Sequence, residues 1–422
     1  MATRATGQPT KILLGKEATP GVLPGTPAAF RLPVFQPNFP FERPTFQSEA
    51  LTGFPEPRTV HLGKKNAAWD FGLECSHASM LPVLELVLGG KRRQGLGFPY
   101  AYEFYLADLV TWFVEEQLDT GENVVTGYLM GGNFDFTVGP EGEMSARVSG
   151  LAAIQTQSGS AAVAAPNITD LAGGFPSFSY LLSRTKVNGT KIGNNKTFQC
   201  SVSRNLGRDI EQDETELTAV IFPQIPTVGG NLTSNWADST MYDHAVSAAL
   251  KSLESWVPGG NGLGLLVEIL AAKFSGVRKE YEGSGLIRTS GRYDAQGPSA
   301  DHPGRAYSGF FETSDLDTET LVVSVDGGGD QTVTFAADGM TPEAVKTAIE
   351  AQTTGCTVTI HREAGEDGAL IALESDTVGA SSSIEVKAAS TADVLLGFDN
   401  VAHSGLDDKS LLITVFSTVD YS

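Results

Sequence analysis

Alternation of hydrophobic and polar residues runs through most of the chain, and a period of two predicts half-buried β-strands. Residues 69–75 alternate in this way. Residues 134–138 and 144–148 alternate on either side of a Gly-Pro-Glu-Gly turn and predict a hairpin. Asn188-Gly189 is typical of another tight hairpin turn. We therefore expect a mainly β protein.

Two short helices are predicted at matching places in this pattern. An apolar stripe follows Cys75 and predicts a helix that Ser76 can cap. Trp236 is separated from Met241 by the same interval that separates Cys75 from Met80, and a second apolar stripe follows. The order of strand, helix and further strands therefore repeats, although identity between the two halves is negligible. This order predicts two copies of one fold.

Proline and small residues mark the segments between the predicted folds. Residues 1–47 contain eight prolines, which predicts an extended arm with one short strand at 11–15. An arm that cannot fold alone is expected to lie on another surface, such as a neighbouring subunit. Residues 161–174 belong to a stretch rich in Ser, Ala and Gly and are predicted to be a linker.

A separate small unit is predicted near the C-terminus, at residues 315–407. It contains a strand, a glycine turn, a second strand and a helix with Thr341 as its cap and Pro342 at its first position. One isolated strand, 411–421, follows the unit and is expected to return to the preceding sheet, as it would after an insertion. The predicted boundaries are an arm at 1–47, a first fold at 48–160, a linker at 161–174, a second fold at 175–314 with 408–422, and the inserted unit at 315–407.

Charge and cysteine usage exclude several classes of protein. The formal net charge is −21, which argues against binding of nucleic acid by phosphate neutralisation. The N-terminus lacks the apolar core of a signal peptide, and no run is long enough to span a membrane. Cys75, Cys200 and Cys356 are far apart and lie at apolar positions, so we expect buried free thiols rather than a disulfide or a zinc site.

No catalytic, metal-binding or cofactor-binding pattern emerges. Cys75 and His77 are neighbours, but no third group is predicted to orient them. The turn at 326–331 contains three glycines but lacks the lysine and the helix start of a phosphate-binding loop. The carboxylates at 315–319 lack the glycine and the final glutamate of a calcium loop. We therefore expect no enzymatic activity, no cofactor and no metal.

Several motifs resemble those of one family. The most specific are Val-Asn-Gly-Thr at 187–190, Asn-Leu-Gly at 205–207, and the series that begins Gly-Asn-Leu-Thr at 230–233 and continues through Trp236 to Tyr242. They resemble the tail tube proteins of long-tailed bacteriophages, in a fused form with two tube folds in one chain. Residues 315–407 are similar to the small decoration domains of phage structural proteins. The resemblance implies a mainly β (α+β) chain of two tandem β-sandwich folds, each with a flanking helix, plus the inserted α+β module.

The same resemblance implies a structural role. Six such folds form a ring in this family, so three chains would supply a pseudo-hexameric ring, and stacked rings would form the hollow tube that conducts DNA to the host cell. The implied partners are other copies of the chain, a tape measure inside the tube, and terminator and tip proteins at its ends. The implied location is the virion tail, assembled in the host cytoplasm, without contact with a membrane.

An acidic bore would let DNA pass without binding, because carboxylates repel phosphates within about one Debye length, ~8 Å. The inserted module is expected to point outward, since a folded domain would block the bore. The candidate acidic residues for the lining of the bore are Glu115, Glu116, Asp135, Glu143, Asp209, Glu211, Asp213, Glu214 and Glu216.

An alternative hypothesis is a tail-tip or surface adhesin that binds a host receptor or a glycan. This hypothesis predicts exposed aromatic side chains on the inserted unit, because sugars stack on aromatic rings. Residues 315–407 contain only Phe335 and Phe398 and no Trp or Tyr, which disfavours the alternative.

Overall fold

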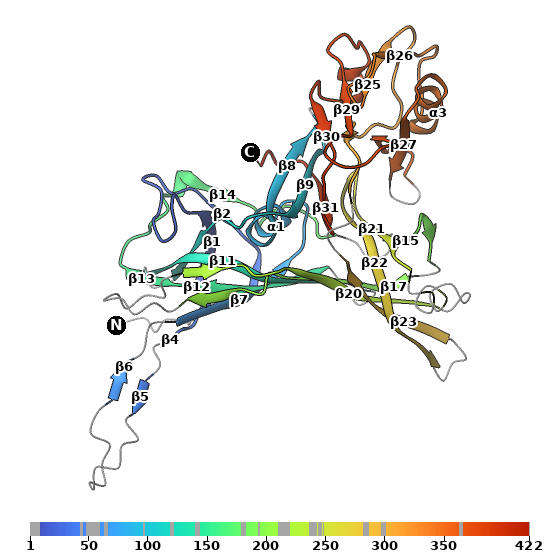
Figure 1. Ribbon diagram of the computed structural model, residues 1–422. Helices are drawn as coiled ribbons and strands as arrows, with labels where there is room; N and C mark the ends of the chain where they lie inside the picture. The colour runs from blue at the N-terminus through green and yellow to red at the C-terminus, as the bar shows by residue number, and fades with distance from the viewer. Residues whose placement is uncertain are drawn as a thin grey trace.

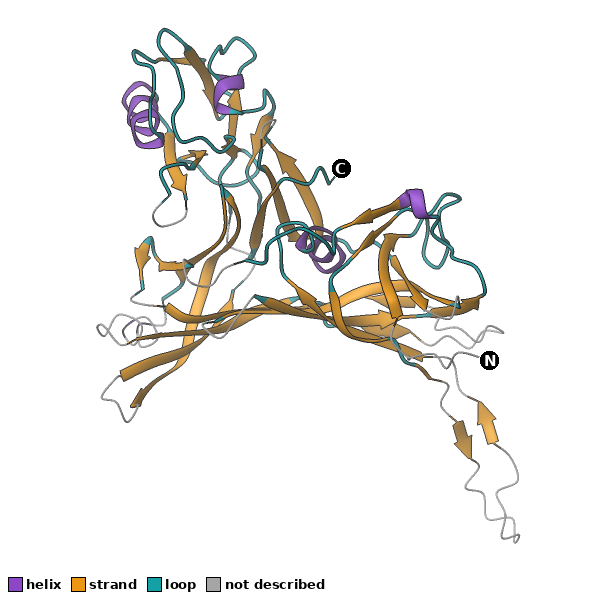
Figure 2. Ribbon diagram, turned by 180° about the vertical axis from the view of Figure 1, so that it is seen from behind, coloured by secondary structure: helices purple, strands orange, loops and turns teal. Residues whose placement is uncertain are grey.

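The computed structural model shows a mostly β protein with an inserted α+β module at one end (Figures 1 and 2). It describes residues 9–42, 45–47, 60–62, 66–95, 98–118, 122–139, 144–178, 183–192, 195–209, 220–235, 243, 247, 249–281, 287–296, 301–362 and 366–421.

A long antiparallel sheet, which we call the platform, runs through both halves of the chain. Hydrogen-bonded neighbours follow the order β3 and β4, β7, β12, β11, β17, β20, β23, β22. Their bounds are β3 Val34–Asn38, β4 Phe41–Glu42, β7 Asn66–Glu74, β11 Asn123–Val138, β12 Ser145–Ala152, β17 Asn195–Ser203, β20 Thr227–Asn235, β22 Leu263–Tyr281 and β23 Ile287–Ala295.

Two smaller sheets cover one face of the platform (Figure 2). The first contains β1 Pro9–Lys16, β2 Ala29–Arg31, β10 Trp112–Leu118, β13 Ile154–Ser158, β14 Ile168–Asp170 and the N-terminal part of β11. The second contains β8 Gly89–Gln94, β9 Tyr100–Leu106, β15 Arg184–Val187, β16 Thr190–Lys191, β21 Lys251–Gly260, β31 Leu412–Ser417 and the N-terminal part of β22. Helix α1, Met80–Leu88, lies between the layers and is buried along its whole length.

One hydrophobic core fills the space between the platform and the layers above it. It takes side chains from both halves, including Phe71, Phe134 and Val267, because inward-facing residues alternate with polar ones along every strand. Strands β11 and β22 belong to the platform at their C-terminal ends and to an upper sheet at their N-terminal ends. Each has a bulge where it passes between the layers, at 131–133 in β11 and at 275–278 in β22.

The backbone pairing shows that the two halves repeat one arrangement. A shift of 161 residues converts the pair Asn38 and Asp70 into Gln199 and Asn231, and both are opposed pairs in the platform. In each pair the two side chains form a hydrogen bond, at 3.0 Å in the first half and 2.9 Å in the second. Strands β3, β4 and β7 are thus equivalent to β17 and β20.

A different residue pair illustrates why the halves lack sequence identity. Trp69 lies opposite Gly150 in the first half, and at the equivalent place Gly230 lies opposite Tyr293. Each glycine leaves room for the ring opposite it, so the large and small partners have exchanged strands. Trp69 donates to the Leu151 carbonyl at 3.1 Å and Tyr293 donates to the Gln199 carbonyl at 2.7 Å. The same space is filled in both halves, but from opposite sides.

The inserted module interrupts the second half at a defined point. In the first half Ala153 alone separates β12 from β13, whereas residues 296–411 separate their counterparts β23 and β31. We call residues 301–411 the module. It has a separate core and two small sheets. Its elements are β24 Arg305–Tyr307, β25 Thr320–Val325, β26 Gln331–Thr334, α3 Pro342–Gln352, β27 Cys356–His361, β28 Leu370–Ser375, β29 Ser383–Val386, α4 Asp393–Leu396 and β30 Ala402–Ser404.

Several local predictions are confirmed. The hairpin of β11 and β12 pairs Phe136 with Ala146, and the Asn188-Gly189 turn joins β15 to β16 with positive φ at both residues. Thr341 caps α3 by accepting the N–H of Ala344. Cys75, Cys200 and Cys356 are free and buried, and burial raises the pKa of the Cys200 thiol to about 12.

Other local predictions were wrong. The arm expected at 1–47 contains its predicted short strand, as β1, but the described part is built into the first half, because β1 lies between β2 and β10 and its Leu13 and Leu14 are fully buried. The stretch 161–174 includes β14, which pairs with β2, so it lies on the first half rather than spanning a gap. The N-cap of α1 is Ser79 and not Ser76. Most of the helix expected at 238–249 lies outside the described residues.

Two peripheral strand pairs complete the architecture. Strands β5 Thr45–Gln47 and β6 Val60–Leu62 pair with each other, as do β18 Gly207–Asp209 and β19 Val220–Phe222. A 3-10 turn, Ala165–Asn167, precedes β14. Among the described residues, no helix has the length and apolar character needed to cross a membrane.

We expect Gly150→Ala to destabilise the fold by about 1–3 kcal/mol, the usual cost of overpacking. A Cβ at Gly150 would lie 2.6 Å from the Trp69 ring and would also meet the Met130 carbonyl. Gly159→Ala is the matched control, because a Cβ there meets no atom within 4 Å. Urea unfolding followed by tryptophan fluorescence measures both, and equal midpoints for the two variants would contradict the packing argument.

We expect His77 to make the fold sensitive to acid. Burial lowers the pKa of His77 from 6.5 to about 4, and its Nδ1 lies 3.0 Å from the Ser417 hydroxyl. The unfolded chain therefore binds a proton first as the pH falls, so stability is lost between about pH 6.5 and pH 4 by up to about 3 kcal/mol. Thermal unfolding across this range should show His77→Gln losing less stability than the wild type. Parallel pH profiles would contradict the assignment.

Candidate assembly interface

The two halves join through a continuous backbone pairing in the middle of the platform. Residues 133–138 of β11 pair antiparallel with residues 203–198 of β17. On the core side, the rings of Phe136 and Phe198 are 5.9 Å apart, and Phe198 stacks on Tyr293 at 6.2 Å. The junction therefore has the hydrogen bonds and the apolar packing of the interior of a sheet, and it closes an edge on each half.

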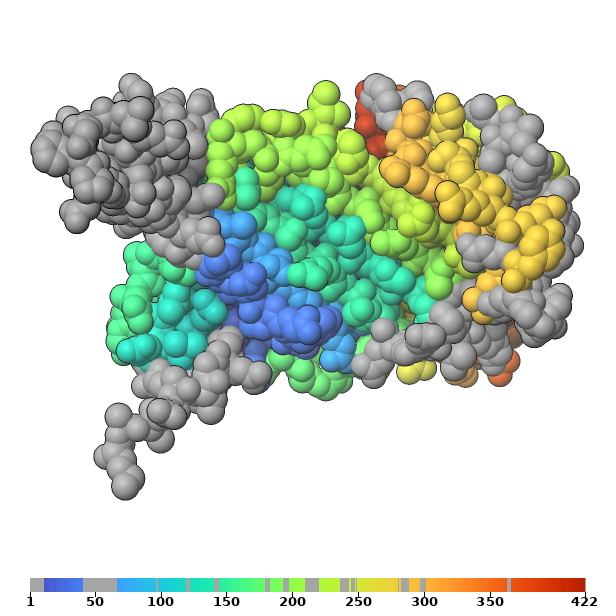
Figure 3. Space-filling view, turned by 90° about the horizontal axis from the view of Figure 1, so that it is seen from below, coloured from blue at the N-terminus to red at the C-terminus, as the bar shows by residue number. Residues whose placement is uncertain are grey.

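The opposite side of the platform, which we call the polar face, is seen from below in Figure 3. The exposed positions of β11 on this face are polar: Asn133, Asp135 and Thr137. At the junction, the Ser203 hydroxyl donates to the Asn133 side chain at 2.6 Å. Farther along, Arg147 pairs with Asp70 at 2.5 Å and Arg292 pairs with Asp294 at 2.9 Å. Shallow depressions run along this face. Because each of these two arginines is next to a carboxylate, the face has alternating charges rather than one sign.

The outer edges of the platform lack a partner strand within the described chain. At one end, β3 and β4 pair only with β7. At the other end, residues 278–281 of β22 pair only with β23. Phe35 is 45% exposed near the first edge and Tyr281 is 77% exposed at the second. Each edge offers unpaired backbone groups together with an exposed aromatic ring.

A second connection joins the halves above the platform. Strand β31 pairs with β22 of the second half and, on its other side, with β9 of the first half. Hairpin β8–β9 thus extends the upper sheet of the second half (Figure 1). The sequence boundaries did not anticipate this exchange, which makes the two halves one structural unit.

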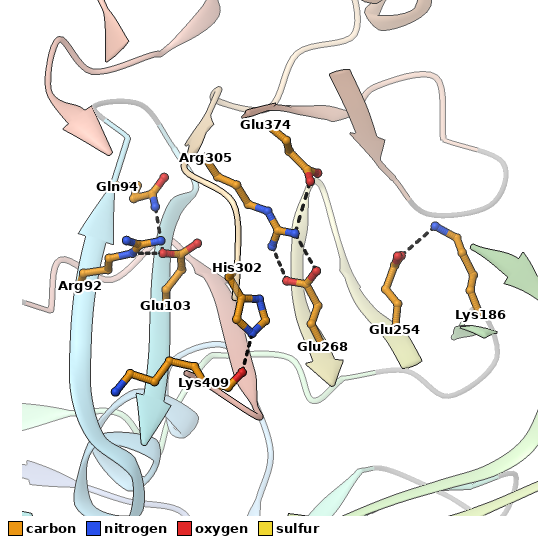
Figure 4. A network of polar contacts seen from close by, with 10 residues as sticks. All are labelled: Arg92, Gln94, Glu103, Lys186, Glu254, Glu268, His302, Arg305, Glu374 and Lys409. Carbon is orange, nitrogen blue, oxygen red and sulfur yellow. Dashed lines mark hydrogen bonds and ion pairs between the residues drawn. The ribbon is translucent and has the colours of Figure 1, made fainter. Parts of the chain in front are cut away.

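The module is held against this shared upper sheet by a buried ion pair (Figure 4). Arg305 of the module forms two hydrogen bonds with Glu268 of β22, one of them at 2.9 Å, and lies 3.3 Å from Glu374. Burial raises the pKa of Glu268, but the Arg305 guanidinium outweighs burial and lowers it, so Glu268 is charged. His302 lies beside this pair and bonds the Lys409 carbonyl at 3.1 Å.

Apolar contacts around the ion pair complete the attachment. The cluster takes Ala101 from the first half, Trp256 and Phe416 from the second half, and Tyr307 from the module. The rings of Tyr307 and Phe416 are 5.2 Å apart, and those of Trp256 and Phe416 are 5.5 Å apart. The module is therefore packed onto both halves and is not a flexible attachment.

The three acidic candidates whose side chains are described, Glu115, Glu116 and Asp135, differ in their surroundings. Asp135 is exposed on the polar face. Glu115 is fully buried on β10 and accepts the N–H groups of Ala162 and Val163. Its carboxylate therefore cannot line a bore, and we no longer propose it for that role. Burial raises the pKa of Glu116, also on β10, to about 7. The side chains of Glu143, Asp209, Glu211, Asp213, Glu214 and Glu216 lie outside the described residues.

Other residues of this interface were missed from the sequence. Asp70 and Arg147 occupy the polar positions of alternating strands, so the period-two pattern could have identified them as neighbours on the polar face. Arg305 and Glu268 had no such signal, because the residues are in different elements and a buried ion pair has no local pattern.

These features describe a mostly β protein of two equivalent folds joined by strand pairing, with the counterpart edges open within the described residues. A family model described as phage tail tube protein matches residues 7–285, which is 279 of the 422 residues. No curated protein matches the chain significantly. The chain belongs to the phage tail tube protein family and is a structural component of the virion tail. The module lies beyond the matched residues.

We expect Arg305→Met to destabilise the attachment of the module by about 3–5 kcal/mol, because Glu268 would be left buried without its counter-charge. The double variant Arg305→Met with Glu268→Leu should recover most of the loss, because it removes both charges. Trp256 belongs to the apolar cluster around this ion pair, and we call the ion pair and the cluster together the seam. Unfolding followed by tryptophan fluorescence therefore measures the change in stability. Equal stability of the wild type and the single variant would contradict the role of the pair.

Proposed function

We propose that the chain polymerises as stacked rings into the hollow tail tube that conducts DNA to the host cell. The observation that carries this proposal is the junction of β11 with β17. This junction joins two equivalent folds edge to edge. The strand equivalent to β11 is β22, and the strands equivalent to β17 are β3 and β4. Within the described residues, these equivalent strands have open edges at the two ends of the platform. Open edges of this kind pair with other chains, and closure into a ring removes them.

The internal junction predicts the register between neighbouring chains. Strand β22 is equivalent to β11 with a shift of 143 residues, since the pair Asp135 and Arg147 corresponds to Arg278 and Ser290. Strands β3 and β4 are equivalent to β17 with a shift of 161 residues. Phe136 lies opposite Cys200 at the internal junction. The two shifts convert this pair into Lys279 and Phe39, so we predict that Lys279 of one chain lies opposite Phe39 of the next.

Both open edges contain residues that discourage pairing with wrong partners. Pro37 and Pro40 lie on the edge formed by β3 and β4, and Arg278 and Lys279 lie on the other edge. Proline lacks a backbone donor, and charged residues oppose uncontrolled strand addition. The internal junction contains no proline in its paired segments. These edges favour a controlled assembly over random aggregation.

Three chains supply the six folds of a ring, which makes it pseudo-hexameric. Its symmetry is threefold, because hairpin β8–β9 reinforces the junction inside each chain and the described second half has no equivalent hairpin. Tape measure protein inside the tube and terminator and tip proteins at its ends are the other partners. Rings assemble in the host cytoplasm, and DNA is transient cargo.

The polar face of the platform is proposed to line the bore. It lies on the side opposite the module, so this orientation points the module outward (Figure 1). Asp135 is the described acidic candidate on this face, and Glu143, Asp209, Glu211, Asp213, Glu214 and Glu216 remain candidates by sequence. The proposed units are the two tube folds, joined by the pairing of β11 with β17 and by β31, and the outward module.

We expect the double variant Phe39→Cys with Lys279→Cys to form disulfides between chains under oxidising conditions. Opposed residues of antiparallel strands have Cα atoms about 4.5–5.5 Å apart, which is within the range for a disulfide. The three native cysteines are buried, so background cross-linking is low. Non-reducing gels should show dimers and trimers, and negative-stain microscopy should show hollow tubes that survive dilution.

Phe39→Cys with Lys273→Cys is the matched control, because Lys273 is exposed on the same strand but out of register. Cross-linking of both pairs to the same extent would contradict the register. A wild-type protein that stays monomeric at high concentration, without tubes, would contradict the proposed function itself.

A further inference from the structure

The negative charge of the chain is concentrated in the module. Residues 301–411 contain 20 Asp and Glu and five Lys and Arg, so they carry −15 of the formal charge of −21. The rest of the chain, almost three times as long, carries the remaining −6. The strong acidity of the protein is therefore a property of its inserted module and not of the folds that form the platform.

Each of the five cations of the module already has a partner. Three of the five form ion pairs with carboxylates of the module: Lys346 with Glu350, Arg362 with Glu343 and Lys387 with Glu385. Arg305 is buried in the seam, and Lys409 contacts the Leu106 carbonyl. Among the described residues, several carboxylates of the module have no cation partner and are exposed. Four of them accept no hydrogen bond within the described part of the chain: Glu312, Asp317, Asp330 and Asp367.

Exposed apolar side chains lie on the same module. Val394 and Leu395 of α4 are exposed, as are Val401 and Val378. Apolar side chains on the outer surface of a filament favour contact between filaments, since every ring repeats them. The module therefore combines an attractive component with a net charge that opposes contact.

We propose that the module is an electrostatic spacer that keeps assembled tubes apart in solution. This inference rests on the proposed function, because it concerns tubes whose modules point outward. Like charges on facing tubes repel within about one Debye length, which is ~8 Å at physiological salt and ~3 Å at 1 M. Tubes are thus dispersed at physiological salt and associate side by side through these exposed apolar side chains when the charge is screened or removed.

Deletion of the module is a poor test. The seam buries Trp256, Leu266 and Phe416 under the module, so its removal would expose a new apolar surface on the tube. That surface would itself cause association, whatever the role of the charge. Substitutions on the exposed surface of the module avoid this problem, because they leave the seam intact.

The test is the fourfold variant Glu312→Lys, Asp317→Lys, Asp330→Lys and Asp367→Lys. It raises the formal charge by eight, from −21 to −13, at exposed positions. The matched control exchanges Asp and Glu at the same four positions and keeps the charge. Tubes of both variants and of the wild type are titrated with NaCl and followed by light scattering and negative-stain microscopy.

We expect wild-type and control tubes to stay single at about 0.15 M salt and to bundle near 1 M, whereas tubes of the lysine variant bundle at about 0.15 M already. Lysine-variant tubes that stay as dispersed as the control would overturn the spacer proposal and leave the tube intact. Should the lysine variant not fold, wild-type tubes that stay single up to 1 M salt would overturn it as well. Absence of wild-type tubes would overturn the proposed function, and the spacer with it.

Discussion

Backbone hydrogen bonding at sheet edges is the constraint on which the rest of this structure depends. A β-strand with one unpaired side must find a partner, face water or be protected. Within the chain, β11 and β17 satisfy this requirement for each other, and they bring the two halves onto one core. Within the described residues, β3, β4 and the end of β22 have no such partner. The open edges are therefore compatible with the structural role that the family match indicates.

The two halves keep one backbone arrangement with different side chains, and the exchange of ring and glycine between Trp69–Gly150 and Tyr293–Gly230 shows how. Packing constrains the combined volume of the two opposed side chains, and either strand can carry the larger one. The two halves also differ in the elements that they contribute. The first half contributes hairpin β8–β9, and the second half accepts it through β31, which comes after the module. The module is consequently held by both halves at once.

Local patterns predicted the strands, the two tight hairpins and the capped helix of the module, because period, turn residues and caps act over a few neighbours. They failed where a partner is distant in sequence. Eight prolines suggested an extended arm that lies on another surface, such as a neighbouring subunit, yet Leu13 and Leu14 are buried in a sheet with β10. The register that we propose between chains could not be predicted from the sequence, because it requires the internal junction as a template. Glu115 was predicted to line a bore, because a strand pattern does not reveal that its carboxylate accepts the N–H groups of residues 162 and 163.

The distribution of charge between the module and the rest of the chain changes what the total charge implies for function. The total of −21 suggested a bore that repels DNA, yet −15 belongs to the module, which lies on the far side of the platform from the polar face. On that face Arg147 and Arg292 each pair with an aspartate. An arginine with a carboxylate partner is a weak binder of phosphate, because the phosphate must compete with a charge already in place. If the polar face lines the bore, easy passage of DNA then depends more on local neutralisation of cations than on a strongly negative wall. In that orientation the large negative charge of the module lies on the outside of the tube, where net charge favours solubility.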